Sequence, residues 1–432
     1  MRKKSNILIL IAIFLITACK STQKTSLEVE WSINFGGSKS DRASRIIQTK
    51  DNNYIVIGQT SSSDGNIKSN KGDSDLLIFK INSSGKTQWV KTFGGSGADF
   101  ATDISKTNDG GYIVCGSTES KNGDVKVNNG RFDYWILKLT KDGELEWEKT
   151  FGGSDHDYAN SIKPTNDGGY ILVGESVSNN GDILNNKKGN DYWILKLNKI
   201  GDIVWQKNLG GSAYDDALMV HQLKDGEFII GGHSESSDGD LKKNNGYSDL
   251  WIVKLDKNGV IKWESSFGGS EYDNFKSIFP TKDGGYIVGA STSSKIGEIK
   301  KDKKYNNFWI LKLDKFGKIE WENMYGGNDN DYLSFVKQTK DGGFIASGYT
   351  NSTDGDIKSK NEQGDFWTIK IDQNGLLIWE KTLGGKDDDY ANSFIETNDN
   401  SFIIIGNSDP YLTPNVSNKY DVNILIYKLK EK

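Results

Sequence analysis

The stretch NDGGYIVCGSTESKNGD, Asn108 to Asp124, decides the fold, because nearly the same string recurs as NDGGYILVGESVSNNGD, Asn166 to Asp182. The rest of the chain repeats with the same period. Tryptophans follow one another at intervals of 58 residues, at positions 31, 89, 147, 205, 263, 321 and 379. A fixed long period indicates one supersecondary unit stacked on copies of itself, each unable to bury its apolar face alone.

One unit, residues 151–208, predicts four β-strands. These runs are short, rich in Ile, Val, Tyr and Trp, and separated by Gly and Asp turns, whereas a helix would need apolar residues three and four apart. The strands are expected at residues 157–164, 168–176, 191–198 and 202–209. The DGG string then forms the tight hairpin between the first two strands, since Asp caps such turns and Gly tolerates positive φ.

Four antiparallel strands repeated radially predict an all-β fold, a seven-bladed β-propeller. Six complete units run from residue 35 to residue 382, and a seventh ends after its third strand. The segment LEVEWSIN, residues 27–34, matches a fourth strand that has no preceding partners. We therefore expect this N-terminal strand to complete the last blade and close the ring without an exposed edge. A linear solenoid is the alternative, and it would leave these strands under-paired.

The first 19 residues differ from the repeats. Arg2, Lys3 and Lys4 precede an apolar run at residues 7–16, which ends in small residues followed by Cys19. This order is typical of a secretory signal, and the run is shorter than the roughly 20 residues that span a bilayer. An uncleaved anchor helix is the alternative.

The end of the apolar run resembles the lipobox of bacterial lipoproteins, which implies lipid attachment, such as palmitate, at Cys19. We therefore expect a lipoprotein signal peptide over residues 1–19, a tether over 20–26 and the propeller over 27–432. The protein would be lipid-anchored in the cell envelope, at the outer membrane. Cys115 is then a lone thiol, expected to be a small core residue, so no disulfide framework is predicted.

Repeats of the form WxKTxGGSxxD and TxDGGYIxxG resemble a family of exported bacterial β-propeller repeat proteins. The segment LDKNGVIKW, residues 255–263, is similar to the tryptophan-docking motif of quinoprotein-dehydrogenase-like propellers, with an Asp-to-Gly spacing one residue shorter. The resemblance implies the fold and export. No motif for a quinone site is visible, and no cofactor is expected.

In such a blade, the connections fall on two faces. The long-loop face carries the turns before the first strand (residues 151–157) and the linkers between the second and third strands (residues 178–191), and the tight-hairpin face carries the two tight hairpins. Long connections are commonly functional, so we expect binding at the long-loop face. The tether would hold the tight-hairpin face toward the membrane.

Each inner strand begins with Asp, which predicts a ring of carboxylates at the channel mouth. They are Asp41, Asp99, Asp157, Asp215, Asp273, Asp331 and Asp389. This ring is the candidate ligand site, for a cation or a polyhydroxy ligand. The alternative is that each Asp caps its own Gly-Gly-Ser turn.

Three other sets of residues recur or stand out. Acidic residues in the long loops include Asp64, Asp124, Asp182, Asp238, Asp240, Asp354 and Asp356, followed by Asp75, Asp133, Asp191, Asp249 or Asp365, with Glu298 and Asn307 in blade five. They lack an EF-hand pattern, so solvated turns are favoured over calcium and no metal site is assigned. Lysines at 80, 138, 196, 254, 312, 370 and 428 are interpreted as surface residues. The tryptophans at 135, 193, 251, 309 and 367 are interpreted as core wedges, and the three histidines as surface residues.

The net charge is −5, from 54 Lys and Arg against 59 Asp and Glu, which argues against nucleic-acid binding. We expect a monomeric, non-enzymatic binding or scaffold protein for a protein or glycan partner. The alternative is a polysaccharide-acting enzyme of the glycoside hydrolase type, using carboxylates near the channel mouth. No residue is assigned a catalytic role.

Overall fold

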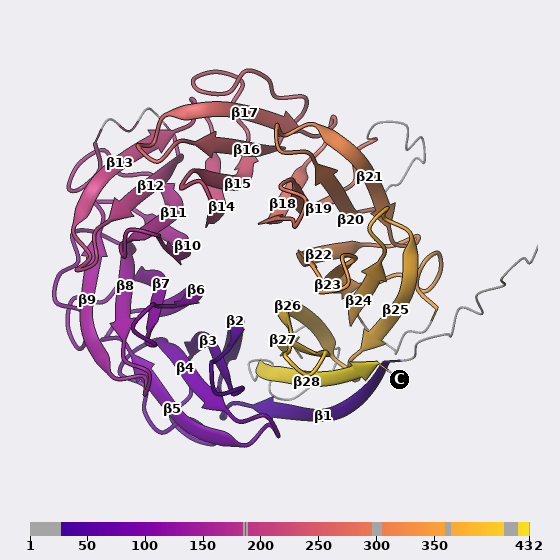
Figure 1. Ribbon diagram of the computed structural model, residues 1–432. Coiled ribbons are helices and arrows are strands. Elements are labelled where there is room, and N and C mark those ends of the chain that lie inside the picture. Colours follow the sequence, from indigo (N-terminus) through magenta and orange to yellow (C-terminus); the bar gives the residue numbers. More distant parts are fainter. Residues whose placement is uncertain are drawn as a thin grey trace, which may run out of the picture.

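The computed structural model describes residues 27–184, 186, 189–295, 305–358, 364–409 and 422–431. These residues form seven four-stranded antiparallel sheets arranged as blades around a central channel (Figure 1). The prediction of a seven-bladed β-propeller is therefore confirmed. The predicted signal peptide, Cys19 and the tether lie outside the described residues. Within the described residues, no helix is both long enough and apolar enough to cross a membrane.

The four strands of each blade follow one another from the channel outward. Blade 1 contains β2 (Asp41–Gln48), β3 (Tyr54–Thr60), β4 (Asp75–Ile81) and β5 (Thr87–Phe93). Blade 2 contains β6 (Asp99–Lys106), β7 (Tyr112–Thr118), β8 (Asp133–Leu139) and β9 (Leu145–Phe151). Blade 3 contains β10 (Asp157–Pro164), β11 (Tyr170–Ser176), β12 (Asp191–Leu197) and β13 (Ile203–Leu209). Blade 4 contains β14 (Asp215–Gln222), β15 (Phe228–Ser234), β16 (Asp249–Leu255) and β17 (Ile261–Phe267).

The remaining blades follow the same order. Blade 5 contains β18 (Asp273–Pro280), β19 (Tyr286–Thr292), β20 (Asn307–Leu313) and β21 (Ile319–Tyr325). Blade 6 contains β22 (Asp331–Gln338), β23 (Phe344–Thr350), β24 (Asp365–Ile371) and β25 (Leu377–Leu383). Blade 7 contains β26 (Asp388–Glu396), β27 (Ser401–Asp409), β28 (Asn423–Glu431) and β1 (Leu27–Phe35).

The N-terminal strand closes the ring. β1 pairs antiparallel with β28, with Trp31 opposite Lys428 and Leu27 opposite Glu431. The ring of Phe35, at the end of β1, stacks on Phe79 of blade 1 with centroids 3.8 Å apart. The predicted closure is therefore confirmed, and the solenoid alternative is wrong. Figure 1 shows the start of β1 beside the end of β28, so both ends of the described chain lie together on the tight-hairpin face.

The core lies between the blades. The middle strands of each blade are buried on both faces because neighbouring blades pack against them; β12, for example, is buried along its whole length. The third-strand tryptophans at 135, 193, 251, 309 and 367 are all among the fully buried side chains, which confirms the core-wedge interpretation. Cys115 is a fully buried core residue, as predicted, and its burial raises the pKa of the thiol to about 12.

The outer tryptophans dock onto glycines of the next blade. Gly143 has a φ of +76°, and a Cβ built on it would lie 2.7 Å from the ring of Trp89 in the preceding blade. The same contact recurs at Gly85, Gly201, Gly259, Gly317 and Gly375. Glycine is therefore needed at this position both for the left-handed turn and for the flat contact with the indole.

The third-strand lysines are buried, so their interpretation as surface residues is wrong for most blades. Lys138 is 4% exposed, and its Nζ lies 2.8 Å from Asp109 Oδ2 and 2.7 Å from Glu146 Oε2. Buried lysines with a carboxylate partner recur at Lys196, Lys312, Lys370 and Lys428. Burial alone would raise the pKa of Asp109, but hydrogen bonds from Lys138 and Thr107 outweigh it and lower the pKa to about 2. The Asp of each DGG hairpin thus compensates a buried charge.

Candidate functional site

The seven aspartates of the predicted ring are buried inside their own blades. Each lies at the long-loop end of its inner strand and is at most 1% exposed. Each Oδ2 accepts a hydrogen bond from the second glycine of its Gly-Gly turn, at 2.6–2.8 Å, in the pairs Gly37–Asp41, Gly95–Asp99, Gly153–Asp157, Gly211–Asp215, Gly269–Asp273, Gly327–Asp331 and Gly385–Asp389. This is the turn-capping geometry, and ligand binding by the ring stays a prediction.

The acidic residues of the long loops also cap turns. Asp124, Asp182, Asp240 and Asp356 accept hydrogen bonds from the first glycine of a Gly-Gly turn, at 2.9–3.1 Å. Asp64, Asp238 and Asp354 accept hydrogen bonds from the backbone NH two residues further along that turn. Glu298 lies outside the described residues. In the part of the chain that the structure describes, no group of three or more acidic, His or Cys residues has metal-binding geometry.

Asp75, Asp133 and Asp249, each the first residue of a third strand, are left with one carboxylate oxygen that has no partner in the described structure. Asp133, the first residue of β8, is fully buried. Its Oδ2 accepts a hydrogen bond from Asn129 N at 2.7 Å, whereas its Oδ1 has no partner within the described structure. Burial, followed by the charge of Asp157, raises the pKa of Asp133 to about 7. The equivalent residue of blade 5 is Asn307, an uncharged isostere.

We expect Asp133→Asn to stabilise the protein at alkaline pH. The folded pKa of Asp133 lies above its unfolded value, so the wild type loses stability as pH rises from about 4 through about 7, and the variant does not. The free energy of unfolding should increase by roughly 2 kcal/mol at pH 8 and be unchanged near pH 4. Denaturant unfolding at both pH values measures this. An equal difference in the free energy of unfolding at the two pH values would contradict the raised pKa of Asp133.

Partly exposed aromatic rings gather at the long-loop end of the channel, between blades 2 and 3. The ring of Phe132 lies 5.2 Å from that of Tyr158 and 5.8 Å from that of His156, and Phe100 lies 5.7 Å from Phe132. A guanidinium nitrogen of Arg131 lies 3.1 Å from Nε2 of His156. We call Phe100, Arg131, Phe132, His156 and Tyr158 the aromatic patch.

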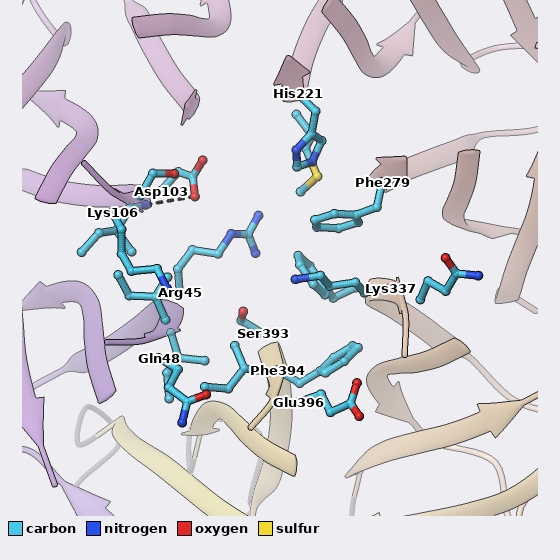
Figure 2. Close-up of a pocket in the computed structure, with 18 of the residues that line it drawn as sticks. Arg45, Gln48, Asp103, Lys106, His221, Phe279, Lys337, Ser393, Phe394 and Glu396 are labelled. Carbon is cyan, nitrogen blue, oxygen red and sulfur yellow. Dashed lines mark hydrogen bonds between the residues drawn. The ribbon is translucent and has the colours of Figure 1, made fainter. Parts of the chain in front are cut away.

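A cavity of about 500 Å³ occupies the channel toward the tight-hairpin face (Figure 2). All seven inner strands contribute to its wall, mainly with the residues of their second halves. Charged and aromatic side chains line it, including Arg45, Asp103, Lys163, His221, Phe279 and Lys337. The interpretation of His221 as a surface residue is wrong, because the side chain lies inside this cavity.

Asp103 is the central acceptor of one wall of the cavity. Its Oδ2 accepts hydrogen bonds from Ser161 Oγ at 2.8 Å and Ile162 N at 3.0 Å, and it forms an ion pair with Lys163. Burial alone would raise the pKa of Asp103, but the charges of Lys163 and Arg45 outweigh it and lower the pKa. Asp103 is therefore an ionised, fully engaged carboxylate.

The repeated motifs do not predict this cavity, because its lining comes from positions that do not repeat. Counted from the aspartate of the predicted ring as position one, the fifth and seventh residues of the inner strands differ from blade to blade, and most of them line this part of the channel. The fifth residues are Arg45, Asp103, Ser161, Met219, Ser277, Phe335 and Ser393, and the seventh are Ile47, Ser105, Lys163, His221, Phe279, Lys337 and Ile395. An alignment of the seven copies within this one chain would mark both positions as free to diverge for function.

Comparisons with known proteins assign this chain to no family. No protein-family model matches the chain, and no curated protein matches it significantly. Among solved structures it is similar to Sqt1 from Chaetomium thermophilum, at 12% identity and a TM-score of 0.49, over 93% of this chain and 99% of that one. It is also similar to BamB from Moraxella catarrhalis, at 12% identity and a TM-score of 0.42, over 93% and 100%. These values say nothing about what this chain binds.

Proposed function

We propose that this protein is a monomeric, lipid-anchored propeller of the cell envelope, held at the outer membrane through Cys19, that binds a partner protein or glycan through its long-loop face. It catalyses no reaction in this proposal. The observation that carries it is the aromatic patch, which places four aromatic rings and an exposed Arg131 at one mouth of the channel. Aromatic and Arg side chains are the residues most enriched at the energetic centres of interfaces.

The opposite face suits a membrane-proximal position. The described chain begins there. In four successive blades, the hairpin between the third and fourth strands exposes an apolar side chain at its tip; these side chains are Ile200, Val260, Phe316 and Leu376, each 56–66% exposed. Lys199, Lys257 and Lys315 stand beside three of these tips. Apolar tips flanked by lysines favour contact with an anionic lipid surface. The aromatic patch would then point away from the bilayer.

A pair of buried carboxyls also lies near the long-loop face. Glu175 and Asp216 lie close to one another near the long-loop end, and their amide partners are Asn190 and Asn160 respectively. Burial, followed by the charge of Glu175, raises the pKa of Asp216 well above its usual range, and burial also raises the pKa of Glu175. A glycosidase needs one neutral and one ionised carboxyl at a defined separation, so this pair is the place to test for the alternative, hydrolytic function.

Site-specific photo-crosslinking in living cells tests the proposal. A photoreactive amino acid at Phe132 or Tyr158 should yield a discrete crosslinked product. The same residue at Phe316, on the tight-hairpin face, is the matched control and should yield no protein product. A protein adduct distinguishes a protein partner, and a glycan array probed with the purified protein distinguishes a glycan.

Substitution of the patch provides the quantitative arm. Phe132→Ala combined with Tyr158→Ala should weaken partner binding by about 100-fold or more, because central aromatic residues at interfaces are worth about 2 kcal/mol or more each. Tyr247→Ala with Tyr272→Ala, which removes another stacked pair on the same face, is the control for general surface changes. Equal crosslinking from both faces, or unchanged binding by the patch variant, would overturn the proposal.

A further inference from the structure

The central cavity carries an excess of positive charge, although the whole chain is acidic. Five cationic side chains line it, Arg45, Lys106, Lys163, Lys337 and Lys340, against the two carboxylates of Asp103 and Glu396. Asp103 already forms an ion pair with Lys163, and Glu396 Oε2 accepts a hydrogen bond from the backbone N of Lys340 at 2.9 Å. The negative charge available in the cavity is therefore largely engaged.

Of the five cations, Arg45 and Lys337 are the two that lie over aromatic rings. Within the described residues, neither has an acidic group within ion-pair distance; the guanidinium of Arg45 makes one long hydrogen bond, 3.4 Å, to the carbonyl of Asn392. Burial in the channel lowers the pKa of Arg45 and of Lys337, and the charge of Lys163 adds to the effect on Lys337. Both side chains therefore present a positive charge to the channel without a carboxylate in direct contact, which leaves that charge available to a ligand.

Aromatic rings hold these two cations in place. The guanidinium carbon of Arg45 lies 5.2 Å from the ring centroid of Phe335, and Nζ of Lys337 lies 5.4 Å from that of Phe279. Phe279 and Phe335 pack edge to face, with centroids 4.9 Å apart. Figure 2 shows Arg45 and Lys337 extending into the middle of the cavity from opposite sides. The site therefore offers two fixed positive groups beside a flat apolar surface.

His221 adds an unpartnered polar atom to the same space. Burial, followed by the charge of Lys163, lowers the pKa of His221 to about 3, so the imidazole is neutral at physiological pH. Its Nε2 is buried without a hydrogen-bond partner in the described structure. An anion bound beside it would favour the protonated form and raise this pKa.

We propose that the cavity binds a small organic anion, in which a phosphate or carboxylate group sits between Arg45 and Lys337 and an apolar part packs on Phe279 and Phe335. The volume, about 500 Å³, suits a molecule of this kind. The site opens on the tight-hairpin face and is separate from the aromatic patch. It neither requires nor tests the proposed partner binding.

Calorimetric titration of the purified protein with phenyl phosphate, inorganic phosphate and benzoate tests the site. Phenyl phosphate should bind saturably with a Kd in the millimolar range or below, and more tightly than inorganic phosphate if the aromatic wall contributes. Benzoate distinguishes a carboxylate from a phosphate preference. The variant Arg45→Gln combined with Lys337→Gln should weaken binding at least about tenfold, since hydrogen bonds to charged groups contribute strongly to affinity.

Two controls keep the result interpretable. Lys86→Gln with Lys257→Gln removes two exposed hairpin lysines outside the cavity and should leave the affinity unchanged. The cavity variant should keep its melting temperature or gain a little, because it relieves repulsion between like charges that line the same channel, so lost binding will not reflect unfolding. The chain has 3 histidines, and NMR should show the ligand shifting the imidazole signals of His221 but not those of His156 or His233. No saturable binding of phenyl phosphate, equal affinity of the cavity variant, or an unmoved His221 would overturn the proposal.

Discussion

A chain that begins at Gly36 is expected to lose cooperative folding, whereas a chain that begins at Leu27 should fold as the full protein does. Removal of residues 27–35 deletes the fourth strand of blade 7, leaves β28 as an open edge and removes Phe35 from its stack on Phe79. The loss should be about 5 kcal/mol or more, comparable to the whole stability of an ordinary domain. Circular dichroism melts of the two chains measure it.

Rescue in trans separates loss of closure from a general defect of the shorter chain. The synthetic peptide LEVEWSINF, residues 27–35, should restore a cooperative melt at millimolar concentration, because a strand can add to an open sheet edge. A peptide with Trp31 and Phe35 replaced by Ser is the matched control and should not. A shortened chain that melts at the temperature of the full one would show that β1 contributes nothing to the ring.

The second large effect is expected at Gly116→Ala. Gly116 lies in β7 opposite the bulge of β6 between Ala101 and Asp103, and a Cβ built on it would collide with the carbonyl oxygen of Phe100. Backbone cannot move aside as a flexible side chain can, so the bulge or the β6–β7 pairing must be distorted. We expect a loss of more than about 3 kcal/mol in the free energy of unfolding.

Gly110→Ala provides the matched control in the same hairpin. Gly110 has a φ of +89°, and a Cβ built on it meets nothing within 4 Å. Only the left-handed backbone conformation is then penalised, at about 1 kcal/mol. Denaturant unfolding of both variants compares the cost of the clash with backbone at Gly116 with the cost of the left-handed conformation at Gly110. Equal losses at the two positions would show that close backbone approach is not what requires glycine in the second strand.

The repeat predicts most of the fold because its period reports the packing directly. The predicted strand at residues 157–164 coincides with β10 (Asp157–Pro164), and the predicted reversal at DGG is the hairpin that follows it. The unmatched LEVEWSIN segment predicted the closure for the same reason: a strand without neighbours in sequence must find them in space. Local propensity and global topology agree throughout the repeat.

The sequence was less informative about burial of charge and about the channel. The third-strand lysines alternate with apolar residues, as surface residues do, and only the three-dimensional approach of the hairpin Asp shows that Lys138 is a buried half of an ion pair. The cavity depends on side chains from all seven blades, which are far apart in the chain. Arg45 and Lys337, 5.2 and 5.4 Å from neighbouring phenylalanine rings, could not have been paired from spacing.

Hydrogen exchange of β1 tests the central claim, closure of the ring by the N-terminal strand, most directly. Peptides covering residues 27–35 should contain amides that exchange as slowly as those of β28, because the amides facing β28 open only when the blade does. We expect these amides and those of β28 to lose protection together as denaturant is added. Amides of residues 27–35 that exchange at the rate of an unfolded chain, while β28 stays protected, would contradict it.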